Sequence, residues 1–228
     1  MSFPYTLIDL THTLDESVPS WDGKYGFSLR TKIDYTDCSS ETKFRVQQIN
    51  IHAGIGTHMD APAHCILDGL AIDQIPLSQL IAPCVVIDIS EKSDAQYSLS
   101  IEDIEAFETK YGPILKGSFV MIKTGWERFW NEPEKYRNNL NFPSCSPEAT
   151  QLLLKRNIVG LGIDTLSPDR PDRAFPVHQM VLGAGKYLVE NAANLDKLPP
   201  TGSFIMIMPL KIKKGTEAPI RLIGLIKK

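Results

Sequence analysis

Histidine and aspartate concentrate in the segment from Asn50 to His64, which reads NIHAGIGTHMDAPAH and holds three of the chain's five histidines. On an extended chain His58, Asp60 and His64 share one face, because side chains alternate with a period of two. A helix would place His58 and Asp60 on different faces, and the glycines and the proline of the segment disfavour a helix. We therefore predict a strand end that passes into an irregular turn and aims these side chains into one pocket.

Imidazole and carboxylate groups in one pocket favour zinc, manganese or iron as ligand partners. A catalytic metal site keeps one coordination position for water beside about three protein ligands, and a further histidine nearby can act as a general base. A single histidine in a strand is more often structural, but several in one register favour a metal site.

By the same reasoning His12, which alternates with apolar residues in DLTHTL, is predicted to be structural. Asp164 and Thr165, at the end of GIDT, fit a site residue and a turn cap equally well.

Strand patterns outnumber helical ones along the chain. Short apolar runs or alternation predict strands in YTLIDLTHTL, CVVIDIS, SFVMIKTGW, IVGLGIDT, SFIMIMPLKI and PIRLIGLIKK, and half-buried strands in FSLRTKIDY and KFRVQQINIHA. One helix is predicted from Ser100 to near Gly112 and another after the candidate cap Ser146, while FPVHQMVLGAG predicts a helical turn that ends at glycine. Helices between strands predict a mixed α/β fold, and we expect a single domain over residues 1–228.

Composition narrows the function classes. The chain has 228 residues, of which 43% are hydrophobic, enough for one sizeable core. The net charge of −3 and the lack of a basic block argue against a nucleic-acid partner. No apolar stretch approaches the roughly 18 residues of a membrane span, and the first ten residues do not form a secretory signal. The four cysteines are widely spaced, which predicts free thiols and a cytoplasmic protein.

The run GTHMDAPAH resembles the signature His-x-Gly-Thr-His-x-Asp-x-Pro-x-His of the cyclase family of metal-dependent hydrolases. That family includes bacterial kynurenine formamidases and isatin hydrolases. Nine of the eleven signature positions run unbroken from Gly56 to His64. Further segments resemble other blocks of the family: IDLTHTLDESVPSWDG, DGLAIDQIPLSQL, IKTGW, GIDTLSPD and PVHQMVLGAGKYLVEN. The resemblance therefore extends over most of the chain.

This resemblance implies roles for individual residues. The metal ligands would be His58, Asp60, His178 and Glu190. Asp60 would be able to bridge two ions, His64 would be the general base, and Trp21 would line the substrate pocket. The resemblance also implies a mixed-sheet swivelling α/β domain, a homodimer or homotetramer, and one or two divalent ions per subunit, zinc or manganese.

The sequence departs from the signature at Gly54, where the family has its first histidine. His52 lies two residues earlier, a span of roughly 6.6 Å along a strand, so it could act as a ligand only through a backbone shift such as a bulge. The more economical interpretation is a structural or pocket-lining His52. The loss at position 54 also leaves open an impaired relative that binds a metal or a small molecule without catalysis.

The function that these features predict is metal-dependent hydrolysis of an amide, lactam or lactone in a small aromatic or cyclic metabolite. A bound metal would polarise the carbonyl and acidify water, and His64 would carry the proton to the leaving group. No Gly-x-Ser-x-Gly motif is present, so serine hydrolase chemistry has no support in the sequence.

Overall fold

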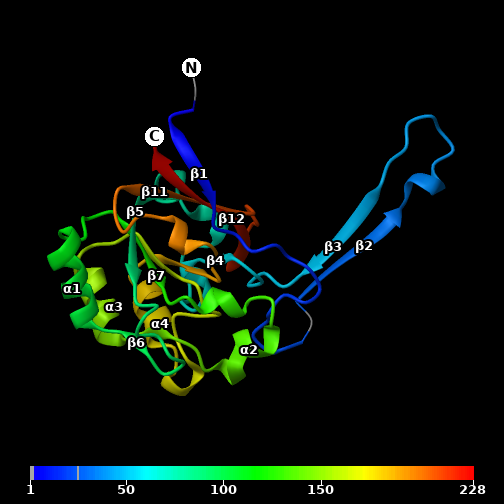
Figure 1. Cartoon of the computed structure of the whole chain (residues 1–228). Helices are drawn as coiled ribbons and strands as arrows, with labels where there is room; N and C mark the ends of the chain where they lie inside the picture. Colours follow the sequence, from blue (N-terminus) through cyan, green and yellow to red (C-terminus); the bar gives the residue numbers. More distant parts are fainter. Residues whose placement is uncertain (1–2, 25) are drawn as a thin grey trace.

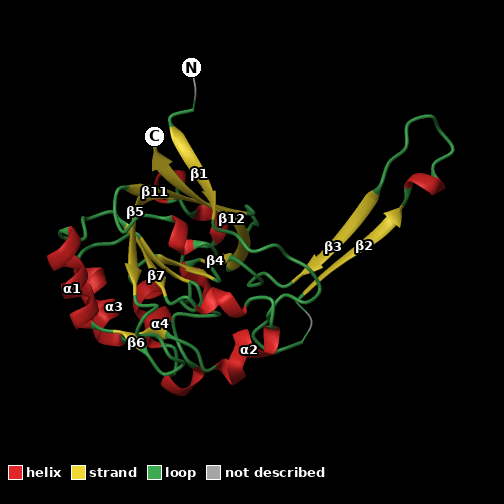
Figure 2. Ribbon diagram, in the orientation of Figure 1, coloured by secondary structure: helices red, strands yellow, loops and turns green. Residues whose placement is uncertain are grey.

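The computed structural model describes residues 3–24 and 26–228 and is organised around one large mixed sheet (Figures 1 and 2). Strand order in this sheet is β1-β12-β11-β5-β7-β9-β10-β4, and β4 also pairs with β12, so the sheet closes on itself. The strands of the sheet are β1 (Tyr5–Asp9), β4 (His58–Asp60), β5 (Ile81–Asp88), β7 (Phe119–Lys123), β9 (Gly160–Ile163), β10 (Tyr187–Glu190), β11 (Ser203–Pro209) and β12 (Glu217–Lys227). The predicted α/β class with a mixed sheet is confirmed; the closure and the short strand β10 were not predicted.

In the described part of the chain, four α-helices connect or flank these strands: α1 (Ile101–Tyr111), α2 (Pro133–Arg137), α3 (Pro147–Lys155) and α4 (Pro176–Gly183). Two of them begin where the sequence predicts. The Ser100 hydroxyl accepts a hydrogen bond from the backbone N–H of Asp103, and the Asp103 carboxylate accepts one from the N–H of Ser100. At α3 the Ser146 hydroxyl accepts a hydrogen bond from the backbone N–H of Ala149, and Pro147 stands in the first turn. A short parallel pair, β6 (Ser98–Leu99) and β8 (Ser144–Cys145), lies beside these helix starts.

The apolar core has two main layers, one on each face of the closed sheet. Met59, Met121 and Val189 belong to the inner layer, enclosed by the sheet. Val120 and Leu188 belong to the outer layer, which packs against α1, α3 and α4. Because successive strand residues point to opposite faces, the residues on either side of Met59 in β4 face outward, toward α4. This alternation determines which side of the sheet carries the polar residues of β4.

Strands β2 (Phe27–Ile33) and β3 (Val46–Ile51) form a separate antiparallel hairpin that extends away from the sheet (Figure 1). The prediction of half-buried strands is wrong here: Leu29 and Ile49 are opposite each other in the register and both are exposed. Alternation identifies which hairpin face is apolar, but none of the residues that the structure describes covers Leu29 or Ile49 on that face.

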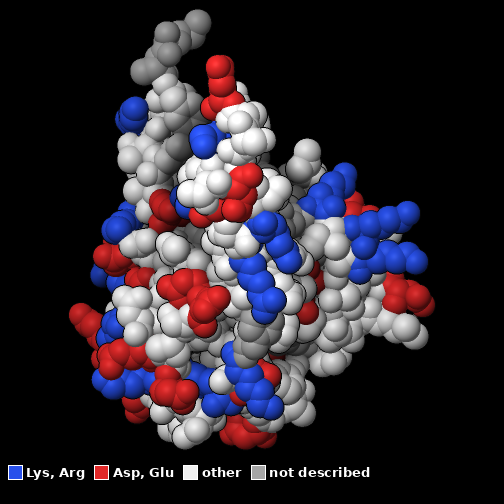
Figure 3. Space-filling view, turned by 90° about the vertical axis from the view of Figure 1, so that its right-hand side faces the viewer, with Lys and Arg blue, Asp and Glu red and all other residues white. Residues whose placement is uncertain are grey.

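Other sequence-based predictions can be checked against the described residues. Cys38, Cys65, Cys84 and Cys145 are all free thiols, as predicted. Among the described residues, no helix has the length and apolarity needed to cross a bilayer. On the face that lies to the right in Figure 1, basic and acidic side chains intermingle rather than separate by sign (Figure 3), so that face produces only a weak long-range field.

Candidate metal-dependent active site

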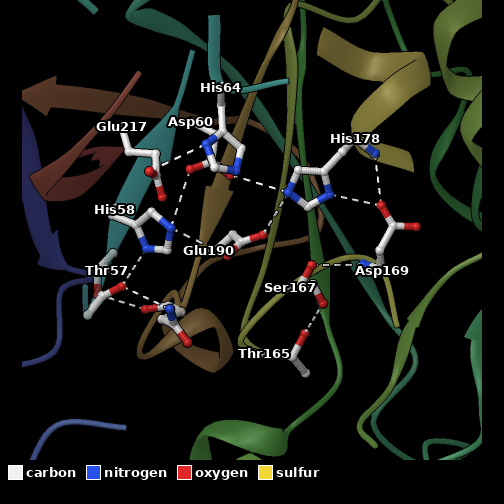
Figure 4. Close-up of polar contacts among 12 residues, drawn as sticks. Thr57, His58, Asp60, His64, Thr165, Ser167, Asp169, His178, Glu190 and Glu217 are labelled. Atoms are coloured by element: carbon white, nitrogen blue, oxygen red, sulfur yellow. Dashed lines mark hydrogen bonds and ion pairs between the residues drawn. The ribbon is translucent and has the colours of Figure 1, made fainter. Parts of the chain in front are cut away.

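The candidate site lies where β4 is paired on both edges. Its residues are placed by register: His58 is opposite Glu190 on β10, and Asp60 is opposite Glu217 on β12. Pairing partners point to the same side of a sheet, so these four side chains share the outer face. His178 reaches the same place from α4, as Figure 4 shows. Four of the residues implied by the family resemblance are therefore brought together: His58, Asp60, His178 and Glu190.

The four side chains surround a common point without bonding closely to one another. Nε2 of His58 lies 3.4 Å from both Asp60 and Glu190, and Nε2 of His178 lies 3.5 Å from both. These separations exceed ordinary hydrogen bonds, but ligand atoms about 2.1 Å from a tetrahedral ion lie about 3.4 Å apart. Oδ1 of Asp60 and Oε1 of Glu190 are buried with no hydrogen-bond partner. Two buried oxygens without hydrogen-bond partners, placed between two imidazoles, are suitable ligands for a divalent cation.

Asp60 belongs to two ligand-capable groups among the described residues. One combines it with His58 and Glu190, and the other combines it with His64 and His178. In each group one donor atom per residue lies within 4.8 Å of the others. Each group could hold a metal ion, and Asp60 is common to both.

The charges of this cluster are strongly coupled. Burial alone would lower the pKa of His58, but Asp60 and Glu190 raise it to about 10. At His178 burial would also lower the pKa, but Asp169 and Asp60 raise it to about 11. Burial raises the pKa of Glu190 to about 8, with Asp60 contributing. The metal-free cluster therefore retains protons on its imidazoles, and a cation must displace them, so metal affinity should rise with pH.

Two hydrogen bonds orient the imidazoles toward the common point. Nδ1 of His58 donates to the carbonyl oxygen of Gly56 at 2.8 Å, which leaves Nε2 facing the cluster. Nδ1 of His178 donates to Asp169 at 2.8 Å, and Asp169 also accepts from the backbone N–H groups of Val177 and His178. A carboxylate behind a ligating imidazole fixes its orientation and raises its basicity. Asp169 has no assigned role in the sequence-based prediction, although it ends the family block GIDTLSPD.

A backbone network holds the signature loop against β10. Oγ1 of Thr57 donates to the Asn191 carbonyl at 2.6 Å and accepts from the His12 N–H at 3.0 Å. Asn191 donates from Nδ2 to the Gly56 carbonyl at 2.9 Å. The His12 ring stacks on Trp130 with 3.8 Å between ring centroids, which confirms the predicted structural role, although its buried Nε2 has no hydrogen-bond partner.

The structure distinguishes between the two roles considered for Asp164, a site residue and a turn cap. Its buried carboxylate accepts hydrogen bonds from Thr124 and from the N–H of Gly125. It holds a turn and does not line the candidate site.

His64 reaches the site through the turn that follows β4. β4 ends at Asp60, and a 3₁₀ turn over Pro62–His64 replaces the extended register that would put positions 58 to 64 on one face. The predicted strand end followed by an irregular turn is confirmed. The His64 ring centroid lies 5.8 Å from that of His178, and Nδ1 lies 3.4 Å from Oε2 of Glu217. Glu217 raises the pKa of His64 above its ordinary value, against the effect of burial.

An open cavity of about 430 Å³ lies above these residues, a size typical of small-molecule sites. Trp21 lines it, as the family resemblance implies, and its ring centroid lies 5.8 Å from that of Phe175. Phe175 and Leu166 supply further apolar lining that the sequence did not single out. The cavity therefore combines an aromatic wall with a polar floor.

Position 54 is occupied differently from the family signature. Gly54 lines the cavity, and Glu217 lies directly beside it. His52 follows the end of β3, is exposed, and is not among the residues that line the cavity. His52 thus belongs to neither ligand-capable group among the described residues, while His58, Asp60, His178 and Glu190 lie together. The alternative of an impaired relative gains no support from this geometry.

Comparison with known proteins shows which family the chain belongs to. Residues 8–170 match the model of the cyclase family, described as "Putative cyclase". The chain belongs to the cyclase family. It is 34% identical to an isatin hydrolase from Roseibium aggregatum over 189 residues, 76% of this chain and 72% of that one. It is 27% identical to a kynurenine formamidase from Geobacillus thermodenitrificans over 217 residues, 94% of each chain.

Solved structures lead to the same family. The crystal structure of an isatin hydrolase bound to the product analogue thioisatinate superposes with a TM-score of 0.90 at 29% identity, covering 99% of this chain and 94% of the other. The named relatives are hydrolases, and the prediction of a cyclase-family hydrolase is confirmed.

Proposed function

We propose that this cyclase-family chain is a metal-dependent hydrolase of an amide bond in a small aromatic metabolite, with a lactam of the isatin type or an aryl formamide as substrate. The observation that supports this most directly is a cluster of two imidazoles and two buried carboxylates below an aromatic cavity wall. The named activities of the relatives, isatin hydrolase and kynurenine formamidase, support the same substrate class.

His58, Asp60, His178 and Glu190 would hold the divalent cation, for which we propose zinc or manganese, as one or two ions. When bound, such an ion polarises the scissile carbonyl and makes water more acidic. Asp169 keeps His178 in position, and the Gly56 carbonyl keeps His58 in position.

His64 is the proposed general base. It is partly exposed at the cavity, next to the cluster but outside the four-residue set. Its imidazole would accept a proton from water and return it to the leaving nitrogen. Trp21 and Phe175 would stack on the flat ring of the substrate and keep the reacting carbonyl above the polar floor.

The test is hydrolysis of isatin and of N-formylkynurenine by protein loaded with zinc or manganese, compared with His64→Ala. We expect turnover of at least one substrate, and a loss of about 10²–10⁴-fold in His64→Ala with metal content unchanged. Absence of turnover for both substrates at every metal loading would disprove the proposal.

We also infer that copies of the chain associate as a homodimer or homotetramer through the β2–β3 hairpin. The support is the exposed apolar pair Leu29 and Ile49, in register on a hairpin that extends away from the sheet. Four free cysteines are in keeping with a cytoplasmic location, which we propose on that ground.

A further inference from the structure

The space beside Gly54 is filled by a side chain from the other end of the chain. A β-carbon placed on Gly54 would collide with Oε1 of Glu217 and lie 3.0 Å from its Cδ. The same β-carbon would lie 3.3 Å from Nε2 of His58, the nitrogen that faces the ligand cluster. The backbone of Gly54 is not in the left-handed region that favours glycine. A side chain at this position would therefore have to displace the carboxylate end of Glu217 from the space that it occupies.

Strand pairing holds Glu217 in this position. Glu217 is the first residue of β12 and lies opposite Asp60, while the next residue, Ala218, lies opposite Met59 in the inner core. Hydrogen bonds from Ala61 to Thr216 (2.9 Å) and from Ile220 to Thr57 (3.1 Å) fasten β12 to β4 on both sides of this pair. The Glu217 side chain consequently points to the outer face, with Asp60 and His58.

The two carboxylate oxygens of Glu217 meet different parts of the site. Oε1 lies beside Gly54, and Oε2 lies 3.4 Å from Nδ1 of His64. Figure 4 shows the carboxylate on the same side of the cluster as His58 and His64. A carboxylate oxygen thus lies where the side chain of the histidine in the resembling signature would begin.

We propose that Glu217 replaces the side chain missing at Gly54 as a ligand of the divalent cation, so that β12 supplies the donor that the signature loop lacks. This inference rests on the proposed metal-dependent function. The complete donor set is then two imidazoles and three carboxylates. Oxygen-rich sets suit manganese and magnesium better than imidazole-rich sets do, so Glu217 shifts the metal preference away from zinc.

The test is a measurement of manganese and zinc dissociation constants by competition with a chromogenic chelator, without substrate. The variants are Glu217→Ala, Glu217→Gln, Gly54→His, and the exchange Gly54→His/Glu217→Ala. Glu105→Ala, at an exposed position on α1, is the matched control. We expect Glu217→Ala to weaken manganese binding by about tenfold or more and the control to match the wild type.

The exchange variant gives the sharpest result. Gly54→His alone should lose affinity and thermal stability because its β-carbon has to displace the Glu217 carboxylate from its present position. Removing Glu217 as well should restore binding, with zinc favoured over manganese relative to the wild type by about tenfold. If Glu217→Ala does not fold, the isosteric Glu217→Gln decides, and it too should bind manganese more weakly.

Several outcomes would overturn the inference. It fails if the folded Glu217 variants bind both metals within about twofold of the wild type, even if their hydrolysis is slower, because Glu217 would then act only on His64. It also fails if the wild type binds no divalent metal. A wild type that binds metal through Glu217 but hydrolyses no amide would refute the proposed function alone.

Discussion

The signature strand β4 and the hairpin β2–β3 are neighbours in the sequence but differ in what surrounds them. β4 has three residues, each buried, and it is hydrogen-bonded to β10 on one edge and to β12 on the other. The hairpin strands have six and seven residues, mostly exposed, and pair only with each other among the described strands. Strand length and apolar content alone do not build a site; pairing on both edges does, because it fixes the direction of every side chain.

The largest expected effect comes from Asp60, the one residue shared by both ligand-capable groups. Asp60→Ala should weaken metal binding by about 100-fold or more and abolish hydrolysis, because it removes the central carboxylate and leaves two buried imidazoles without it. Elemental analysis after dialysis and a substrate assay measure both. Asp34→Ala in the hairpin turn is the control and should keep its metal. Stoichiometric metal in Asp60→Ala would show that the site is not centred on β4.

A smaller effect concerns the support of the signature loop by His12. Burial lowers the pKa of His12 to about 4, against an ordinary value of 6.5, despite a hydrogen bond with the Ala192 backbone. The unfolded chain therefore binds this proton first, and stability falls as pH drops from about 6.5 toward 4. His12→Phe keeps the stacking on Trp130 but cannot take up this proton. Between about pH 6.5 and pH 4 its free energy of unfolding should therefore fall by roughly 2 kcal/mol less than that of the wild type.

Urea unfolding of both metal-free proteins at pH 7 and pH 4 measures this difference. The subtraction cancels the titration of the other histidines. Parallel losses in the two proteins would contradict the assignment of a buried neutral His12.

Substitutions on the hairpin should change the oligomeric state of the protein and leave its fold intact. Leu29→Lys/Ile49→Lys is expected to reduce the oligomer to a monomer, because it places charge on the apolar face that we propose to be an interface. Light scattering after size-exclusion chromatography measures the mass. Leu115→Lys, at another exposed leucine, is the control. An unchanged oligomer, or a wild type that is already monomeric, would rule out the hairpin as the interface.

The smallest effect is expected at the Asp34–Arg45 ion pair, 2.9 Å long and exposed near the hairpin tip. Surface pairs contribute little because water screens them. Arg45→Ala should shift the melting temperature by less than about 2 °C and leave metal affinity unchanged. A large shift would mean that the hairpin is stabilised by its own charges and that the contrast with β4 is weaker than proposed.

Local features were largely readable from the residues. Ser100 and Ser146 start helices because their hydroxyls accept the free N–H groups of a first turn, an interaction that depends only on near neighbours. The spacing of His58 and Asp60 around Met59 likewise predicted a shared face, since alternation is a property of any strand. His178 and Glu190 were assigned by family resemblance, because they lie far from His58 in the chain.

By itself, then, the sequence determined the chemistry available: the imidazole and carboxylate donors, the local strand and helix starts, and the apolar positions. Tertiary structure decided which of these act together. The predicted last strand began at Pro219, and only the pairing of β12 with β4 brings Glu217 beside Gly54. Alternation placed the apolar residues Leu29 and Ile49 on one face of the hairpin, but it could not show that this face is left exposed. The reason in both cases is that periodicity specifies the direction of a side chain relative to its own strand, whereas contact depends on which distant segment packs there.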